Sequence, residues 1–196
     1  MPYQFFSCSA NNKHATATAN GSCRMSRDIV WLSDGGDLGD FMAGAREPAN
    51  IRPIFVYGTL MAAPLLAWVL TGDASKTDEV LAQRKLGRIT GFSRHIVLGS
   101  DYPALLPTSD TEAAVEGFVV FPRNISERSK LDTFEGDAYI RTPVAVDVGG
   151  ETVEADTYVW MKDRSELGDE DWNFTFFESE RLDDWLELFR GMELIA

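Results

Sequence analysis

Short runs of apolar and aromatic residues, separated by glycine, proline and polar turn residues, organise the chain from residue 53 onwards. The first run, residues 54–57, is apolar or aromatic throughout, which is typical of a strand in the interior of a sheet. Pro103 interrupts a later run and makes it an edge or loop-like strand, because proline cannot donate to a β-ladder. The pattern predicts strands at residues 54–57, 86–91, 95–98, 102–106 and 115–121.

Two longer runs, residues 139–148 and 152–161, alternate between apolar and polar positions. Gly149 and Gly150 separate them, and a glycine pair favours the two-residue turn of a β-hairpin. The sequence therefore predicts an antiparallel hairpin that turns at these two glycines.

Two helical patterns flank the predicted strands. Pro64 suits a first helical turn and Gly72 suits a helix stop, so a short helix is expected over residues 64–70. Residues 174–190 place apolar side chains on one stripe and acids on the other. This pattern predicts one amphipathic helix that packs against the sheet.

A third helix is expected over residues 125–134. Asn124, followed three residues later by Glu127, has the form of an N-cap and capping box, and Gly136 stops the helix. Many strands with few, separated helices indicate an α+β fold and argue against alternating strand–helix units.

The length of 196 residues suits one domain, since a second core would need roughly 100 residues of its own. We assign this domain to residues 51–196. Residues 1–50 are rich in Ser, Ala, Asn, Gly and Thr, so they are predicted to be an N-terminal extension, flexible or partly docked. Trp31 and Phe41 are candidate anchors for that extension.

The formal charge of -13 argues against a nucleic-acid partner, because it would repel a phosphate backbone and no basic face compensates. Acidic residues concentrate after residue 162, but their spacing is not that of a calcium loop, so no metal site is predicted. Cys8 and Cys23 are interpreted as free thiols of a reducing compartment. The first residues resemble neither a signal peptide nor a membrane anchor, so we expect a cytoplasmic protein, and a monomer by default.

Glu135 is the sharpest candidate for chemistry. It lies at the end of a predicted helix, where the negative end of the helix dipole disfavours a carboxylate, so stability alone does not explain it. Burial near Phe134 and Tyr139 would raise the pKa of the carboxyl toward that of a general acid or base. The alternative is a solvent-exposed glutamate at a helix end.

The segment after the first strand is a second candidate. Gly58 lacks the Cβ that would keep a ligand away from the main chain. The N–H groups after Gly58 could accept a carboxylate or an oxyanion, with Thr59 as a hydroxyl donor, although Tyr57 and Gly58 alone also fit a core residue and a turn. Ser93 has no nucleophile context, and a lone His95 is interpreted as making a local hydrogen bond.

The remaining signals are motifs distributed over residues 53–190. They are Phe55-Val56-Tyr57-Gly58-Thr59-Leu60, Tyr102-Pro103-Ala104-Leu105, Val115-Glu116-Gly117, Leu131-Asp132-Thr133-Phe134-Glu135-Gly136 with Tyr139 and Arg141, Ala155 with Tyr158-Val159-Trp160, and Trp172 with Phe174. In this order they resemble the γ-glutamylcyclotransferase-like proteins, closest to the plant and fungal avirulence-induced-gene-like branch. Residues 1–50 lie outside the resemblance.

The resemblance implies a small, mostly antiparallel β-barrel flanked by helices, with a pocket at one mouth. Such proteins convert a γ-glutamyl amide into 5-oxoproline and a free amine, with no metal or other cofactor. By position, Glu135 matches the acid/base glutamate of the family. The glutamyl-holding loop matches Tyr57, Gly58, Thr59 and Leu60, and Tyr139 lines the pocket.

Three functions stay open at this point. The first is a cyclotransferase that acts on a γ-glutamyl amino acid or a γ-glutamylamine. The second uses the same fold for a glutathione-derived conjugate, a specialised metabolite or another cyclisation. The third is a small-molecule-binding protein without turnover, against which the intact Glu135 argues.

Overall fold

The structure is a computed structural model that describes residues 51–192. The predicted extension of residues 1–50 lies outside the described residues, together with Trp31, Phe41, Cys8 and Cys23. Residues 193–196 lie outside them as well. Within residues 51–192, every helix is too short or too polar to pass through a bilayer.

Five strands close into a barrel in the order β1-β5-β2-β6-β7. Neighbouring strands pair antiparallel except β1 and β7, whose parallel pairing completes the ring. The predicted α+β fold with a mostly antiparallel barrel is confirmed. The barrel strands are β1 (Ile54–Val56), β2 (Arg84–Thr90), β5 (Ala114–Val120), β6 (Tyr139–Val148) and β7 (Glu151–Trp160).

β1 is apolar on both faces because both faces are buried. Phe55 points into the barrel and packs in its interior cluster with Val119 and Val159. Ile54 and Val56 belong to a second cluster that lies between the barrel and the helices. The uninterrupted apolar run that predicted an interior strand therefore reflects burial on two sides.

β6 and β7 form the predicted hairpin. Val148 pairs with Glu151, and Gly149 and Gly150 make the turn with φ angles of 64° and 91°. Positive φ at both central residues is the requirement of a type I′ turn, which explains why two glycines stand there.

β3 (Phe92–Ile96) and β4 (Pro103–Pro107) form a separate two-stranded antiparallel sheet. The predicted strand at residues 95–98 was placed too late, because Gly91 turns the chain from β2 directly into β3 with a φ of 75°. Residues 166–170 bond along β3, with the Gly168 N–H donating to the Ile96 carbonyl at 3.0 Å. The proline-bounded β4 agrees with the predicted edge strand.

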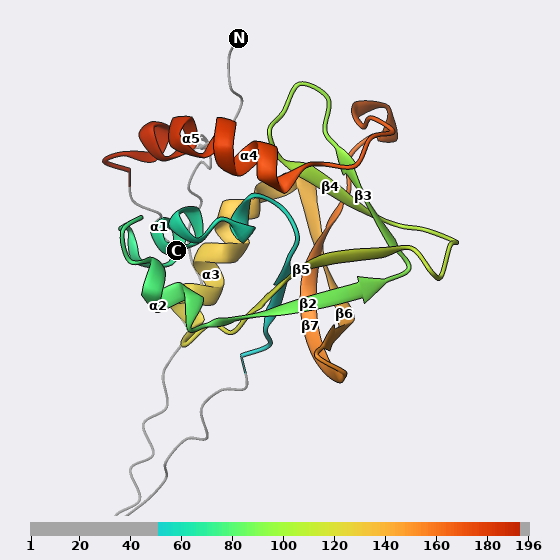
Figure 1. Ribbon diagram of the computed structural model, residues 1–196, viewed down its shortest axis with the longest axis horizontal. Helices are drawn as coiled ribbons and strands as arrows, with labels where there is room; N and C mark the ends of the chain where they lie inside the picture. The colour runs from blue at the N-terminus through green and yellow to red at the C-terminus, as the bar shows by residue number, and fades with distance from the viewer. Residues whose placement is uncertain (1–50, 193–196) are drawn as a thin grey trace, which may run out of the picture. The chain divides into compact units, whose positions relative to one another are not determined.

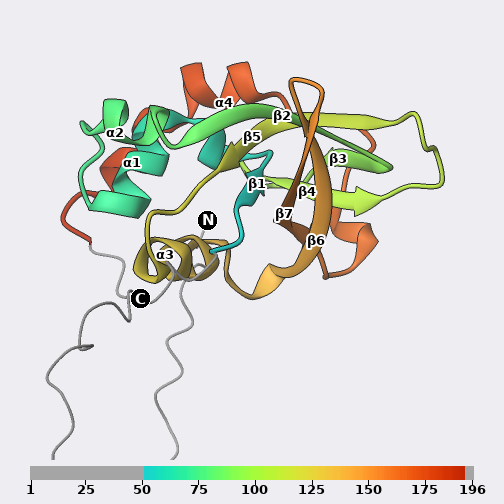
Figure 2. The same ribbon diagram turned by 90° about the horizontal axis from the view of Figure 1, so that it is seen from below.

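Three helices group on one side of the barrel strands (Figures 1 and 2). They are α1 (Ala63–Thr71), α2 (Thr77–Leu81) and α3 (Ile125–Glu135). α1 begins and ends where Pro64 and Gly72 predicted. α2 was not predicted, because a five-residue helix is too short to show a helical period.

α3 is capped by Asn124, whose side chain accepts a hydrogen bond from the Glu127 N–H at 2.8 Å. The predicted capping box differs in its return bond. The Glu127 carboxylate accepts from the N–H of Arg123 at 2.7 Å, one residue before the cap. The helix start was thus predicted correctly from a local signal, although its second bond shifts by one position.

The predicted single helix over residues 174–190 is wrong. The structure has α4 (Phe174–Glu180) and α5 (Leu182–Phe189), separated at Arg181, whose φ of -125° is not helical. The break lets α5 reach across α1, where Phe189 stacks on Trp68 with ring centroids 4.4 Å apart. α5 therefore packs on helices, including Phe134 of α3, and not simply on the sheet as predicted.

Candidate active site

Glu135 is the last residue of α3, next to the short turn η2 (Gly136–Ala138) that leads into β6. Gly136 has a φ of 68°, which glycine adopts without strain, so the helix stops where the sequence predicted. The carboxylate is thus carried at the junction between the helical layer and the barrel, and Glu135 is only partly exposed.

Three tyrosines, one just after β1 and the others in β6 and β7, lie close enough for the charge of Glu135 to act on their hydroxyls. Burial raises the pKa of each tyrosine, so each hydroxyl keeps its proton and donates it. All three protons go to other acceptors and leave Glu135 without a hydrogen bond from them. Tyr57 donates to the Tyr158 carbonyl at 2.6 Å, Tyr139 to the Pro103 carbonyl at 2.8 Å, and Tyr158 to Asp132 Oδ1 at 2.9 Å.

Burial is the main reason why the pKa of Glu135 rises from its ordinary 4.5 to about 8, and the nearby charge of Asp132 raises it further. The neighbouring cations pair with other carboxylates. Arg128 and Arg141 both bond Asp132, at 3.3 Å and 3.1 Å. Among residues 51–192, no ion pair includes Glu135. The pKa of Glu135 is raised, as the sequence predicted.

Residues 57–60 follow β1 and form the short turn η1 (Thr59–Met61). Tyr57, Thr59 and Leu60 are buried, and the first bond of the turn runs from the Met61 N–H to the Gly58 carbonyl at 2.9 Å. A Cβ at Gly58 would lie 2.7 Å from Cγ of Pro103. The glycine therefore makes room for Pro103. Its role in letting a ligand approach the main chain stays a prediction.

The structure brings the predicted site residues into one region. Tyr139 bonds the carbonyl of Pro103, Pro103 covers Gly58, and Tyr57 lies within the electrostatic reach of Glu135. Their elements are far apart in sequence and meet where α3 ends against the barrel.

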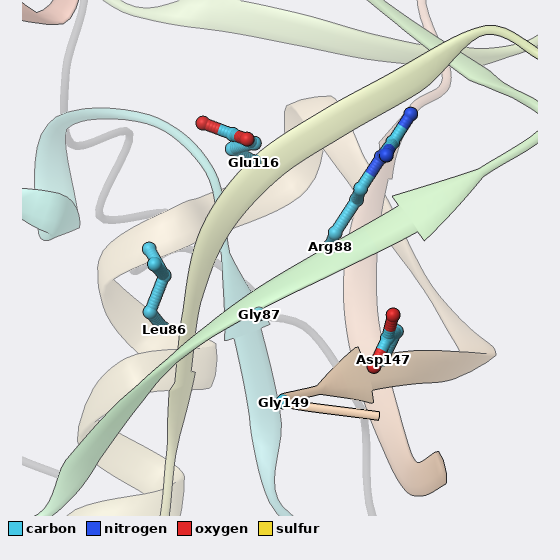
Figure 3. A pocket seen from close by; sticks show the side chains of 6 residues that line it. All are labelled: Leu86, Gly87, Arg88, Glu116, Asp147 and Gly149. Carbon is cyan, nitrogen blue, oxygen red and sulfur yellow. The ribbon is translucent and has the colours of Figure 1, made fainter. Parts of the chain in front are cut away.

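Two surface hollows of the described chain lie elsewhere. One, of about 150 Å³, is lined by Leu86, Gly87, Arg88, Glu116, Asp147 and Gly149, as Figure 3 shows. The other, of about 620 Å³, is lined by residues of β2, β3 and β5 together with Ala113 and Asp171. Neither is lined by Glu135 or by residues 57–60. The candidate site is therefore identified by the buried Glu135 carboxyl and not by a hollow in the surface.

A family model described as gamma-glutamyl cyclotransferase, AIG2-like, matches residues 54–174. The chain belongs to this family. The matched segment contains β1, the turn after it and Glu135, and it ends at the start of α4.

Two Arabidopsis thaliana proteins with solution structures share the fold of this family member. One is 25% identical, with a TM-score of 0.50, and the match covers 72% of this chain and 81% of the other. The second is 24% identical, with a TM-score of 0.50, and the match covers 70% of this chain and 87% of the other. No functionally curated protein matches this chain significantly.

Sequence reasoning missed several bonds between segments that are distant in sequence, one of which reaches Tyr57. Arg94 donates to the Tyr57 carbonyl at 3.1 Å and pairs with Asp171. Asp101 accepts the Trp185 indole N–H at 3.2 Å through its side chain, and its carbonyl accepts that of Trp172 at 2.7 Å. Because these bonds join residues that are far apart in the sequence, no local sequence pattern predicts them.

The interpretation of His95 as a residue with local bonds is confirmed. Its Nε2 lies 2.9 Å from the Ser93 hydroxyl, and its Nδ1 lies 3.2 Å from the Gly168 carbonyl. These contacts tie β3 to the segment beside it, and they lie outside the Glu135 cluster.

Proposed function

We propose that this chain is a cofactor-independent γ-glutamylcyclotransferase-type enzyme, which cyclises a γ-glutamyl amide to 5-oxoproline and releases an amine. The observation that carries the proposal is the desolvated Glu135 carboxyl, whose pKa is raised to about 8, in a chain of the gamma-glutamyl cyclotransferase, AIG2-like family. A glutamate with the ordinary pKa of 4.5 is too weak a base for an ammonium group whose pKa is about 8 or higher. The raised pKa of Glu135 brings its proton affinity close to that of the substrate ammonium group.

Glu135 acts first as a base and then as an acid. Its carboxylate takes one proton from the α-ammonium group of the substrate, and the freed amine attacks the γ-carbonyl carbon of the same molecule. A carbon–nitrogen bond forms and closes a five-membered ring, while the γ-amide bond to the leaving nitrogen breaks. Glu135 returns the proton to that nitrogen, so the carboxylate is regenerated. The second proton that the ring nitrogen loses on becoming an amide passes to the released amine, which leaves as an ammonium ion. Because the attack is intramolecular, holding the glutamyl chain folded lowers the entropic part of the barrier.

Tyr57, Gly58, Thr59 and Leu60 are proposed to hold the glutamyl group. The N–H groups of Thr59 and Leu60 precede the first bond of η1, and no hydrogen bond between residues 51–192 uses them. Such donors suit a carboxylate or a developing oxyanion. Tyr139, fixed by its bond to the Pro103 carbonyl, is proposed to line the site.

The test is 5-oxoproline release from a panel of γ-glutamyl amino acids, γ-glutamylamines and glutathione. Wild type is compared with Glu135→Gln and with Glu127→Gln, a matched control on the same helix. We expect release from at least one panel member, a loss of about 100-fold or more in Glu135→Gln, and activity in Glu127→Gln close to that of wild type.

Two outcomes would overturn the proposal. Equal turnover by wild type and Glu135→Gln would remove Glu135 from the chemistry. A folded wild type that releases 5-oxoproline from no panel member would favour a different substrate or a binding role, which calorimetry with the same panel would then separate.

A further inference from the structure

Asp132 is the second carboxylate on the C-terminal half of α3. It precedes Glu135 by three residues, so the two side chains lie on the same face of the helix, one turn apart. Placing two carboxylates there is electrostatically unfavourable, both for the pair and for the helix dipole. The arrangement therefore requires an explanation other than helix stability.

Three side chains from three elements hold the Asp132 carboxylate. The Tyr158 hydroxyl of β7 donates to Oδ1 at 2.9 Å, and Arg141 of β6 donates to Oδ2 at 3.1 Å. Arg128, one turn earlier on α3, lies 3.3 Å from Oδ2. These bonds hold the Asp132 carboxylate in place, one turn before Glu135 on the same helix.

The arginine on α3 is itself anchored. Arg128 donates to Asp156 at 2.6 Å and to the Arg52 carbonyl at 2.6 Å, and its side chain is 11% exposed. Asp156 also lies 3.8 Å from Nε of Arg141. With Arg52, whose Nε lies 3.3 Å from Asp156 Oδ1, three arginines pair with the two aspartates, and none of the three pairs with Glu135.

The groups that face Glu135 come from each element packed against it. Tyr57 follows β1, Tyr139 starts β6 and Tyr158 lies in β7, and all three are neutral donors bonded elsewhere. Among the residues that the structure describes, Asp132 is the charged group that acts on Glu135. A substitution that removes the charge of Asp132 should therefore change the proton affinity of Glu135 directly.

We propose that Asp132 is a positioning residue for proton exchange at Glu135: its fixed charge favours the protonated Glu135 carboxyl, and Arg128 and Arg141 moderate that charge. A second carboxylate makes Glu135 a stronger base once it has ionised, because the negative charge of Asp132 increases the proton affinity of the Glu135 carboxylate. The catalytic meaning of this role rests on the cyclotransferase function proposed above. The electrostatic role does not, and it can be measured without turnover.

The network predicts that two substitutions move the titration midpoint of Glu135 in opposite directions. Asp132→Asn removes the negative charge and leaves two arginines less neutralised, so the titration midpoint of Glu135 falls. Arg141→Gln removes a positive charge from Asp132, so the midpoint rises. A merely structural role for these residues would give no reason for opposite signs.

The experiment follows the titration of Glu135 by NMR of protein labelled with ¹³C at the glutamate side-chain carboxyl, assigned by its loss in Glu135→Gln. We expect the midpoint to fall by about one pH unit, a tenfold change in proton affinity, in Asp132→Asn. Arg141 is exposed and screened, so Arg141→Gln should raise the midpoint by about 0.3 pH unit, roughly twofold. Asp132→Glu keeps the charge and should stay near wild type, and so should Asp147→Asn, an exposed control on β6.

An unchanged midpoint in folded Asp132→Asn, or a fall in Arg141→Gln, would overturn the inference. If Asp132→Asn does not fold, Arg141→Gln still decides the sign, because its side chain lies at the surface. For turnover, the pH at which kcat/KM is half-maximal should move in the same directions. If wild type releases no 5-oxoproline but the Glu135 midpoints move as expected in the variants, the proposed function is contradicted. The electrostatic role of Asp132 is then still supported.

Discussion

The two ends of α3 each carry a glutamate, and the two carboxylates differ in whether they have hydrogen-bond and ion-pair partners. At the N-terminal end, Glu127 is 5% exposed, yet its carboxylate accepts the N–H of Arg123 and the Arg123 guanidinium, both at 2.7 Å. At the C-terminal end, Glu135 has an aspartate for a neighbour and tyrosines whose protons are bonded elsewhere. Within one helix, burial is offset at one carboxylate and left uncompensated at the other. The first arrangement stabilises the fold, and the second provides a group that can exchange a proton.

The largest effect on stability is expected at the compensated end. Glu127→Ala leaves the Arg123 N–H and guanidinium without their acceptor, and charge-assisted hydrogen bonds of this kind contribute about 2–3 kcal/mol. Urea unfolding should show that loss for Glu127→Ala, whereas Glu135→Gln should unfold at or above the midpoint of wild type. A similar loss in both variants would mean that the two ends do not differ.

The second effect concerns pH. The pKa of Glu135 is about 8 in the folded protein and 4.5 ordinarily, so between these values the folded state keeps a proton that the unfolded state has lost. The contribution of Glu135 to the free energy of unfolding is fully present below about pH 4.5 and is lost as the pH rises through 8. The unfolding free energy of wild type should therefore fall relative to Glu135→Gln by about 1–2 kcal/mol from pH 5 to pH 8, since partial solvent contact screens the rest. Urea titrations at three pH values measure it, and a constant difference would contradict the uncompensated environment.

The smallest effect tests the N-terminal cap alone. Asn124→Ala removes the acceptor for the Glu127 N–H and should cost about 1 kcal/mol, whereas Asn124→Asp should retain most of the stability. Thermal unfolding of the two variants is the measurement. If Asn124→Ala were to lower the apparent pKa of kcat/KM, the two ends of α3 would be coupled and the contrast between them would weaken.

Elements whose signals are local were predictable from the sequence. The glycine pair at residues 149–150, the Asn124 cap and the stop at Gly136 each depend on neighbouring residues, and each stands where expected. The break at Arg181 was not predictable, because the apolar stripe of residues 174–190 continues through it and only packing on α1 requires the bend.

The candidate site divides in the same way. Glu135 and residues 57–60 could be named from their motifs, since the residue types and their order carry the resemblance to the family. The reason for Gly58 could not be named, because Pro103 reaches it from a distant strand.

The sequence by itself determined the α+β class, the hairpin, the limits of α3 and the acidic residue at its end. Only the tertiary structure decided what that residue experiences. The bond from Tyr57 to Tyr158 joins positions 101 residues apart, and the bond from Tyr158 to Asp132 joins positions 26 apart. Desolvation and competition for hydrogen-bond donors depend on every group that surrounds a carboxyl in space, and those groups meet only when the barrel closes on the end of α3.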